Sequence, residues 1–435
     1  MSTLKHNPWL WVPTLYLIEG IPYVIVNNIS MAMLTAMGVP NGQMALFTSL
    51  LYLPWIIKPL WGPIVDIVRT KRWWIISMQV LLTACFIGLA LTIPQPEAAM
   101  IAEHTTPIHL FMAMLIIFWI TAFVSATHDI AADGFYILSL NESQQAAFVG
   151  IRSTFYRIAT ILGQGALLFV VGRLSLTRDI SSAWQLAFFA AAILLGVCTL
   201  WHTRALPHEE QKTTEIHSLR EVLKTFAHTW TTFFQKKGLA IAILFLLLFR
   251  LPEALILKII YPFMMASVDN GGLALTLDTI GIVYSTIGLI CLTIGGIIGG
   301  LFVSHIGIYR AFWWMVAAIT LPDLAYVYLA YAQPEQLLWI TVAIAIEQFG
   351  YGFGFTAYML YMIRCSEGKY CSSHYAICTM FMALSMMLPG MIAGYLQEAI
   401  GYSAFFLLAM GCCLVTVIVS VPISKQLKHN PTQND

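Results

Sequence analysis

Residues 108–138 read IHLFMAMLIIFWITAFVSATHDIAADGFYIL, an apolar run whose only charged residues are Asp129 and Asp133. As an α-helix this run is long enough to cross about 30 Å of hydrocarbon, which needs roughly 20 residues. An ionised side chain inside a bilayer is costly unless it faces a partner or a water-filled cavity. The run therefore predicts a transmembrane helix with one side turned toward a polar interior.

The rest of the chain repeats this pattern. It is 59% hydrophobic and 10% charged over 435 residues, and its mean hydropathy is +0.79. The hydrophobicity is continuous and not alternating, which favours helices over the strands of a membrane barrel. We therefore predict an all-α polytopic membrane protein with twelve transmembrane helices, the other eleven at 9–36, 44–66, 73–93, 145–172, 182–203, 238–265, 279–302, 311–331, 337–363, 374–398 and 402–424.

The positive charges predict the orientation of these helices. Lys and Arg near span ends are retained on the cytoplasmic side of a membrane. With both termini cytoplasmic, only Arg173 and Arg178 among the loop bases fall on the opposite side. The first run lacks a charged leader and a small-residue cleavage site, so we expect a retained helix and not a signal peptide.

A polar stretch divides the predicted spans into two sets of six. We predict a helical bundle at 1–204, a cytoplasmic linker at 205–237, a second bundle at 238–424 and a short cytoplasmic tail at 425–435. Within the linker, 218–234 has the spacing of an amphipathic helix lying on the membrane surface, although a simple connector is the alternative. Gly62, Asp66 and Arg72 recur as Gly300, Ser304 and Arg310 at a constant offset, which predicts two pseudo-symmetric halves.

Several function classes are disfavoured by composition. A net charge of +1 argues against nucleic-acid binding. The eight cysteines are scattered without metal-ligand spacing, and neither a phosphate-binding glycine loop nor a nucleophile elbow is present. We therefore expect no metal, no cofactor and no enzymatic activity.

Charged residues inside the predicted spans are the candidate functional groups. A carboxyl group in a low-dielectric cavity can alternate between protonated and charged forms, so we expect some of the acids to couple transport to protons, although static ion pairs are the alternative. Asp323 follows Pro322 and can instead cap backbone freed by the proline. The proton-coupling candidates are Glu19, Glu253, Glu347 and Asp129.

The bases and uncharged polar residues of the spans predict a binding cavity for an anionic substrate. Asp133 lies four residues after Asp129 on one helix face, and Arg152 and Arg157 in the next span are the expected counterions of the two acids. We expect a cluster of Asp129, Asp133 and Arg152 to serve structure or gating, with direct coupling or binding as the alternative. The substrate-binding candidates are Lys58, Arg157, Arg250, Lys258, Asn27, Asn28, Tyr23, Gln348 and Tyr351.

The loop after the second span carries a family resemblance. Gly62-Pro-Ile-Val-Asp66, followed by Arg69, Lys71 and Arg72, resembles the motif between spans two and three of the major facilitator superfamily, although its basic ending is altered. The resemblance implies two six-helix bundles that rock around a central site. It also implies a gating role for Asp66 and Arg72.

A closer resemblance lies in the fourth span. Ser125-Ala-Thr-His128-Asp129-Ile-Ala-Ala-Asp133-Gly134 resembles the Gln-Asp-Ile-x-x-Asp segment of the branch that holds AmpG-like muropeptide permeases and acetyl-CoA transporters, with His128 in place of Gln. This resemblance implies a monomeric proton symporter that imports anhydromuropeptides across a bacterial inner membrane for peptidoglycan recycling. Its partners would be the lipid bilayer, protons and the small-molecule substrate. Carriage of another bulky anion, such as acetyl-CoA or a siderophore, and a non-transporting membrane sensor stay open as alternatives.

Overall fold

The structure, a computed structural model, describes residues 7–208, 219–236, 238–368 and 371–429. Over these residues every regular element is a helix. In this part of the chain ten helices are long and apolar enough to cross a membrane. They are Pro8–Ala36, Lys71–Leu91, Ile108–Ser139, Ser143–Leu174, Ile180–Ala205, Leu239–Met265, Leu277–Ile306, Ile308–Ala332, Leu337–Cys365 and Ser373–Lys428.

Two features separate these ten helices from the twelve predicted spans. The predicted span 44–66 is divided into α3 (Asn41–Leu50), α4 (Leu53–Ile57), a 3₁₀ turn (Lys58–Leu60) and α5 (Gly62–Ile67). Pro54 and Pro59 lie in this region and lack the N–H that a continuous helix needs. At the other end of the chain, α20 (Cys371–His429) runs through both of the last predicted spans and bends at Gly401, whose φ is 77°. The count of twelve thus stays a prediction.

The chain forms two compact units. Unit 1 comprises 1–39 and 51–226, and unit 2 comprises 40–50 and 227–435. This division differs in two respects from the predicted one, which had domain boundaries at 204 and 237. The short segment 40–50 belongs to unit 2, and α12 (Leu219–Phe234), inside the predicted linker, contributes to both units.

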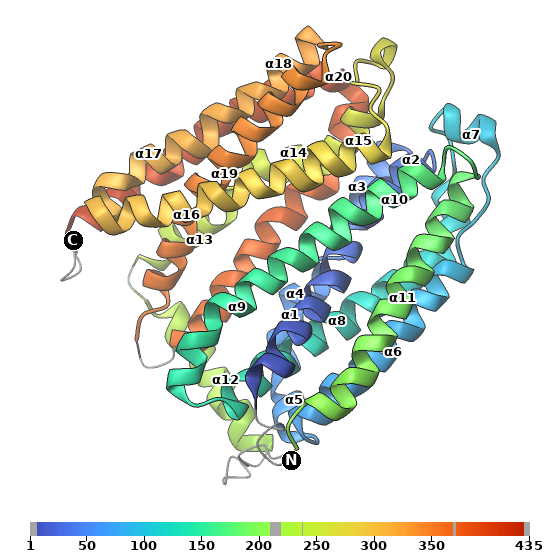
Figure 1. The fold of residues 1–435 in the computed structure, drawn as a ribbon. Coiled ribbons are helices and arrows are strands. Elements are labelled where there is room, and N and C mark those ends of the chain that lie inside the picture. Colours follow the sequence, from blue (N-terminus) through green and yellow to red (C-terminus); the bar gives the residue numbers. More distant parts are fainter. Residues whose placement is uncertain (1–6, 209–218, 237, 369–370, 430–435) are drawn as a thin grey trace. The chain divides into compact units, whose positions relative to one another are not determined.

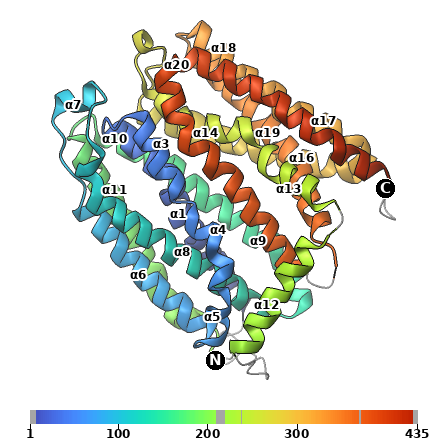
Figure 2. The ribbon, with the colours of Figure 1, turned by 180° about the vertical axis from the view of Figure 1, so that it is seen from behind.

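Unit 1 is a helical bundle built around α8 (Met112–Ser139). Helix α8 packs against α1 (Val12–Val24) and α6 (Lys71–Leu91), while α6 packs in turn against α11 (Ile180–Ala205). Figures 1 and 2 show this neighbourhood from opposite sides. A short helix, α7 (Ala98–Ala102), lies between α6 and α8 in the chain.

A close approach joins α1 to α9 (Glu142–Thr160). A methyl group on Gly20 would lie 2.7 Å from Cβ of Ala159, so only glycine allows the two helices to come this near. Both helices then pass through a π-helical turn, at Ile25–Ile29 and Ile161–Ala166, before they continue as α2 (Ser30–Ala36) and α10 (Leu167–Leu174). Such turns are often found at functional sites.

Unit 2 contains α13 (Leu239–Leu248), α14 (Leu251–Met265), α15 (Leu277–Ile282), α16 (Leu289–Ile306), α17 (Ile308–Thr320), α18 (Leu324–Ala332), α19 (Leu337–Cys365) and α20. Helix α19 packs between α16 and α17, and α20 packs against α13 and α14. A third π-helical turn, Val283–Gly288, joins α15 to α16.

Helix α3 is held in unit 2 by polar contacts with α20. Nδ2 of Asn41 donates to Oε1 of Gln397 at 2.6 Å, and the backbone N–H of Gly42 donates to Glu398 at 2.8 Å. A methyl group on Gly394 would lie 2.0 Å from the carbonyl oxygen of Asn41, so the two backbones are in direct contact. This packing explains why 40–50 groups with the second unit although it lies early in the chain.

Candidate functional site

An ionic cluster crosses the interior of unit 1. Lys58, in the 3₁₀ turn after α4, pairs with Asp129 on α8. One turn further along α8, Asp133 pairs with Arg152 of α9 at 2.6 Å. The helical spacing of four residues places both acids on the same face of α8, where the two bases reach them from different helices.

Tyr16 of α1 supports the second of these pairs. Its hydroxyl donates to Oδ1 of Asp133 at 3.3 Å. The guanidinium of Arg152 lies 4.4 Å from the centroid of the Tyr16 ring, within the range of a cation–π contact. The tyrosine thus contacts both members of the pair, and sequence reasoning missed it because a lone Tyr in an apolar helix carries no signal of such a contact.

Glu19 adds a third acid to this cluster. It lies on α1, is buried with 6% of its surface exposed, and its Oε2 atom has no hydrogen-bond partner among the described residues. Its carboxyl group lies near those of Asp129 and Asp133. Ionised carboxylates this close in an apolar interior would repel one another, and a proton on one of them would relieve the repulsion.

Four of the predicted substrate-binding residues lie near the π-helical turns of unit 1. Nδ2 of Asn28 donates to Oε1 of Gln164 at 2.9 Å, which links the first turn to the second. Asn27 donates to the backbone of Tyr23, and Oδ1 of Asn27 is buried without a hydrogen-bond partner among the described residues. Arg157 lies on α9 with an exposed side chain.

Aromatic rings surround the same place. The Tyr23 ring packs edge-on against Trp55, with ring centroids 5.0 Å apart. The centroid of the Tyr156 ring lies 6.5 Å from that of Tyr23. These rings and the polar groups of the π-helical turns offer stacking surfaces beside hydrogen-bond donors and acceptors.

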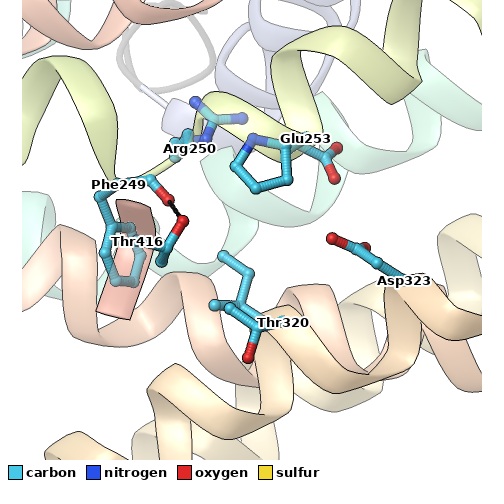
Figure 3. A pocket seen from close by; sticks show the side chains of 8 residues that line it. Phe249, Arg250, Glu253, Thr320, Asp323 and Thr416 are labelled. Carbon is cyan, nitrogen blue, oxygen red and sulfur yellow. Dashed lines mark hydrogen bonds between the residues drawn. The ribbon is translucent and has the colours of Figure 1, made fainter. Parts of the chain in front are cut away.

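A second acidic cluster lies in unit 2. Carboxylate oxygens of Glu253 (α14), Asp323 (3₁₀ turn Leu321–Asp323) and Glu347 (α19) all lie within 4.8 Å of one another, and all three residues are buried. Figure 3 shows the carboxyl groups of Glu253 and Asp323 pointing toward one another across a small cavity. Three ionised carboxylates at such distances in an apolar interior would repel strongly, and a proton or a cation would stabilise the cluster.

Neighbouring side chains donate hydrogen bonds to two of these acids. Glu347 accepts from the hydroxyl of Tyr326 at 2.7 Å and from Nε2 of Gln348 at 2.9 Å. Asp323 accepts from the thiol of Cys413 at 3.4 Å. The sequence indicated only that Asp323 follows Pro322. Its contacts could not be predicted because they come from three other helices, α14, α19 and α20.

Arg250 lines the cavity beside Glu253 and Asp323. Its guanidinium donates to the hydroxyl of Tyr351 and lies 4.7 Å from the centroid of the Phe355 ring. In the part of unit 2 that the structure describes, three acids thus face one arginine at this place. Tyr351 and Phe355 contact the guanidinium beside the cavity, where it could pair with an anion.

Lys258 lies apart from the acids. It is 1% exposed, and its Nζ donates to Oγ1 of Thr48 on α3 at 3.2 Å. A methyl group on Gly390 would lie 3.2 Å from Cε of Lys258, so α20 also confines this side chain. The structure therefore places Lys258 at the α3 contact and not in the acidic cluster.

The predicted gating residues lie in two places of unit 1. Asp133 and Arg152 form the ion pair described above. Arg72, at the start of α6, donates to the backbone oxygens of Thr203 at 2.6 Å and Leu206 at 3.4 Å, at the end of α11. Asp66 belongs to α5, but its side chain lies outside the described residues.

The sequence matches one family model, that of the Major Facilitator Superfamily, over residues 14–369. Curated relatives include a Rickettsia conorii protein that carries the name AmpG 4, 25% identical over 93% of this chain and 92% of the relative. The anhydromuropeptide permease of Escherichia coli K12 is 20% identical over 94% of this chain and 78% of the relative.

Solved structures of transporters share the fold. A crystal structure of the nucleoside transporter NupG has a TM-score of 0.65 at 16% identity and covers 95% of this chain and 98% of its own. A crystal structure of a D-xylose–proton symporter has a TM-score of 0.68 at 12% identity and covers 94% of this chain and 95% of its own. At these identities the likeness concerns the fold alone.

Proposed function

Because the chain belongs to the major facilitator superfamily, we propose that it is a proton-coupled secondary active transporter that imports anhydromuropeptides by alternating access. The observation that carries the proton coupling is the ionic cluster of unit 1. There, Glu19 is a buried third acid beside two acid–base pairs. The named activity of the Escherichia coli relative supports the substrate.

Proton coupling follows from the cost of moving an unmatched charge. An occluded carrier excludes water, so a bare carboxylate on its interior is strongly disfavoured. When Glu19 or Asp129 carries a proton, the cluster of unit 1 is electrically balanced. The acids Glu253 and Glu347 of unit 2 are the second place where protons can be held, with Asp323 beside them.

The proposed substrate suits the chemistry of the candidate binding residues. An anhydromuropeptide combines sugar rings with peptide carboxylates. Tyr23 and Tyr351 offer faces for the rings, and Arg250 and Arg157 offer guanidinium groups for the carboxylates. Lys58, Lys258, Asn27, Asn28 and Gln348 complete the proposed substrate-binding set.

Two alternatives use the same residues differently. The same arginines suit another bulky anion, such as acetyl-CoA or a siderophore, and a non-transporting sensor would bind substrate without moving it. Bacterial relatives support a bacterial inner membrane as the location. The distribution of Lys and Arg supports cytoplasmic termini, and the proposed import would run from periplasm to cytoplasm. The gating roles of Asp66, Arg72, Asp133 and Arg152 belong to this proposal, as does function as a monomer.

The direct test is uptake of labelled GlcNAc-anhydroMurNAc-tripeptide into proteoliposomes. Uptake is measured with an inward proton gradient, with an inward sodium gradient, and with no gradient, each with and without excess acetyl-CoA. The proposal expects accumulation only with the proton gradient and no competition by acetyl-CoA. Accumulation driven by sodium would reassign the acids to cation binding, and binding without uptake would favour the sensor.

A further inference from the structure

A chain of buried hydrogen bonds crosses four helices of unit 1 and ends beside the ionic cluster. Oγ1 of Thr14 (α1) lies 2.9 Å from Nε2 of His202 (α11), and Nδ1 of His202 lies 2.9 Å from Oε1 of Gln79 (α6). Nε2 of Gln79 then lies 3.0 Å from Nε2 of His128 (α8). Gln79, His128 and His202 are each at most 1% exposed, and the residue after His128 is Asp129.

The amide of Gln79 makes the two imidazoles depend on one another. In the arrangement described, its oxygen accepts from Nδ1–H of His202 and its NH₂ donates to Nε2 of His128. Both rings are then neutral, with His202 protonated on Nδ1 and accepting from the hydroxyl of Thr14 on Nε2. Each of the three hydrogen bonds then joins one donor to one acceptor.

Reversal of the amide gives a second state in which each of these hydrogen bonds again joins a donor to an acceptor. The oxygen of Gln79 then accepts from Nε2–H of His128, and its NH₂ donates to Nδ1 of His202. Nε2–H of His202 donates to Thr14, whose hydroxyl can donate to the carbonyl oxygen of Trp11 at 3.3 Å. In this state His128 can take a second proton on Nδ1 and keep its hydrogen bond to Gln79, whereas in the first state a proton on Nε2 would break that bond.

The neighbouring acids act in favour of such an imidazolium, against the cost of burying its charge. Asp129 follows on the same helix, Glu19 lies near Asp129 on α1, and Lys58 already pairs with Asp129. Helix α6 presents the uncharged Gln79 and α11 presents His202. A positive His128 would give this cluster three bases for its three acids.

We propose that His128 is a second proton-holding residue of the unit 1 cluster, and that Gln79, His202 and Thr14 are positioning residues whose reversal lets the charged ring keep its hydrogen bond to Gln79. The inference rests on the proposed proton coupling. It adds that the proton of the cluster moves between the Glu19–Asp129 carboxyl pair and the imidazole of His128. The tautomer of His202 would then indicate whether the proton is on the carboxyl pair or on His128.

The test is ¹⁵N NMR of histidine-labelled full-length protein in lipid nanodiscs between pH 5 and 9. Spectra of His128→Gln and His202→Gln assign the two rings. We expect His128 to gain its second proton in this range, and His202 to change from Nδ1–H to Nε2–H at the same midpoint. In Gln79→Met the tautomer of His202 should no longer follow His128, whereas Gln397→Met, which removes a buried glutamine of unit 2, should preserve the coupling.

A neutral His128 throughout this range, or a constant His202 tautomer while His128 titrates, would overturn the inference. The spectra do not depend on transport, so the two proposals can fail separately. Coupled titration in a protein without proton-driven uptake would refute the transport mechanism alone. Proton-driven uptake by a protein whose His128 stays neutral would refute the histidine alone.

Discussion

Nη2 of Arg152 lies 2.6 Å from Oδ1 of Asp133, and this pair joins α9 to α8 across the interior of unit 1. The ring of Tyr16 lies against the guanidinium, so three helices meet at one ion pair. The Lys58–Asp129 pair lies one turn away on α8. Among the residues that the structure describes, Glu19 is the acid of this cluster that forms no ion pair with a base.

Replacing Arg152 by Gln should destabilise the protein, because the Asp133 carboxylate would lose its base inside the bundle. The two side chains are 32% and 39% exposed, so we expect a loss of about 1–2 kcal/mol, between the values for exposed and buried pairs. Thermal unfolding in detergent measures this change. Asp133→Asn in the same chain should recover part of the loss, and additive effects of the two substitutions would contradict a direct pairing.

Glu19→Gln should balance the charges of the unit 1 cluster permanently. Glutamine keeps the size of the side chain but cannot release a proton. We expect substrate exchange between equal concentrations to persist while accumulation driven by a proton gradient is lost. Exchange and gradient-driven uptake in the same proteoliposomes separate the two. Full proton-driven accumulation by the variant would remove Glu19 from the coupling.

Glu253→Gln tests the acidic cluster of unit 2 in the same way. The substitution removes one of three mutually repelling carboxyl groups, so the folded protein should be at least as stable as the wild type. We expect proton-driven accumulation to be abolished while exchange stays at least partly intact. Asp323→Asn serves as a comparison within the cluster. Unchanged accumulation in Glu253→Gln would exclude this residue from proton coupling.

The positions of the charged residues along the chain could be predicted better than their partners. The apolar runs give most of the helices, and the spacing of Asp129 and Asp133 gives their common face. The neighbours of Asp323 could not be predicted, because helices that are apolar on all sides do not reveal which side faces the interior. Glu253, Asp323 and Glu347 come together only when each of their three helical segments turns the correct side toward the interior.

The π-helical turns had no sequence signal either. Ile25–Ile29 contains two asparagines and Ile161–Ala166 two glycines, residues of low helix propensity that do not specify a π-helical turn over a bend or a helix end. The two turns lie where α1 packs against α9. The resulting shift in side-chain direction brings Asn28 to Gln164. Local sequence preferences cannot specify a contact that forms only when two distant helices meet.

Asp179 gives a prediction for pH dependence outside the spans. It precedes α11, and the backbone N–H of Ser182 donates to its carboxylate at 2.8 Å, which lowers the pKa of Asp179. A lowered pKa in the folded state adds stability above the unfolded value, about 3.9, and this stability is lost as the pH falls. Asp179→Asn should therefore lower the melting temperature at pH 7, and the difference should shrink between about pH 4 and pH 3.

The control for Asp179 is Glu335→Gln, which removes an exposed acid between α18 and α19. This variant should melt like the wild type at both pH values. A difference for Asp179→Asn that is the same at pH 7 and about pH 3 would show that the ionised carboxylate does not stabilise the start of α11.

Alanine substitutions at two glycines of α16 distinguish a steric clash with a neighbouring helix from the general effect of replacing glycine in a helix. A methyl group on Gly295 of α16 would lie 2.1 Å from the carbonyl oxygen of Phe349 in α19. Gly300, on the same helix, has no atom within 4 Å of that position. Because the obstacle at Gly295 is backbone, Gly295→Ala must push α16 from α19, at a cost of about 1–3 kcal/mol.

Gly300→Ala gains the better helix propensity of alanine without a clash, so its stability should equal or exceed that of the wild type. Thermal unfolding of both variants in the same detergent provides the comparison. The contact between α16 and α19 positions Glu347, so Gly295→Ala should also weaken substrate transport, while Gly300→Ala should retain it. Equal stability of the two variants would mean that α16 and α19 do not approach as closely as the structure describes.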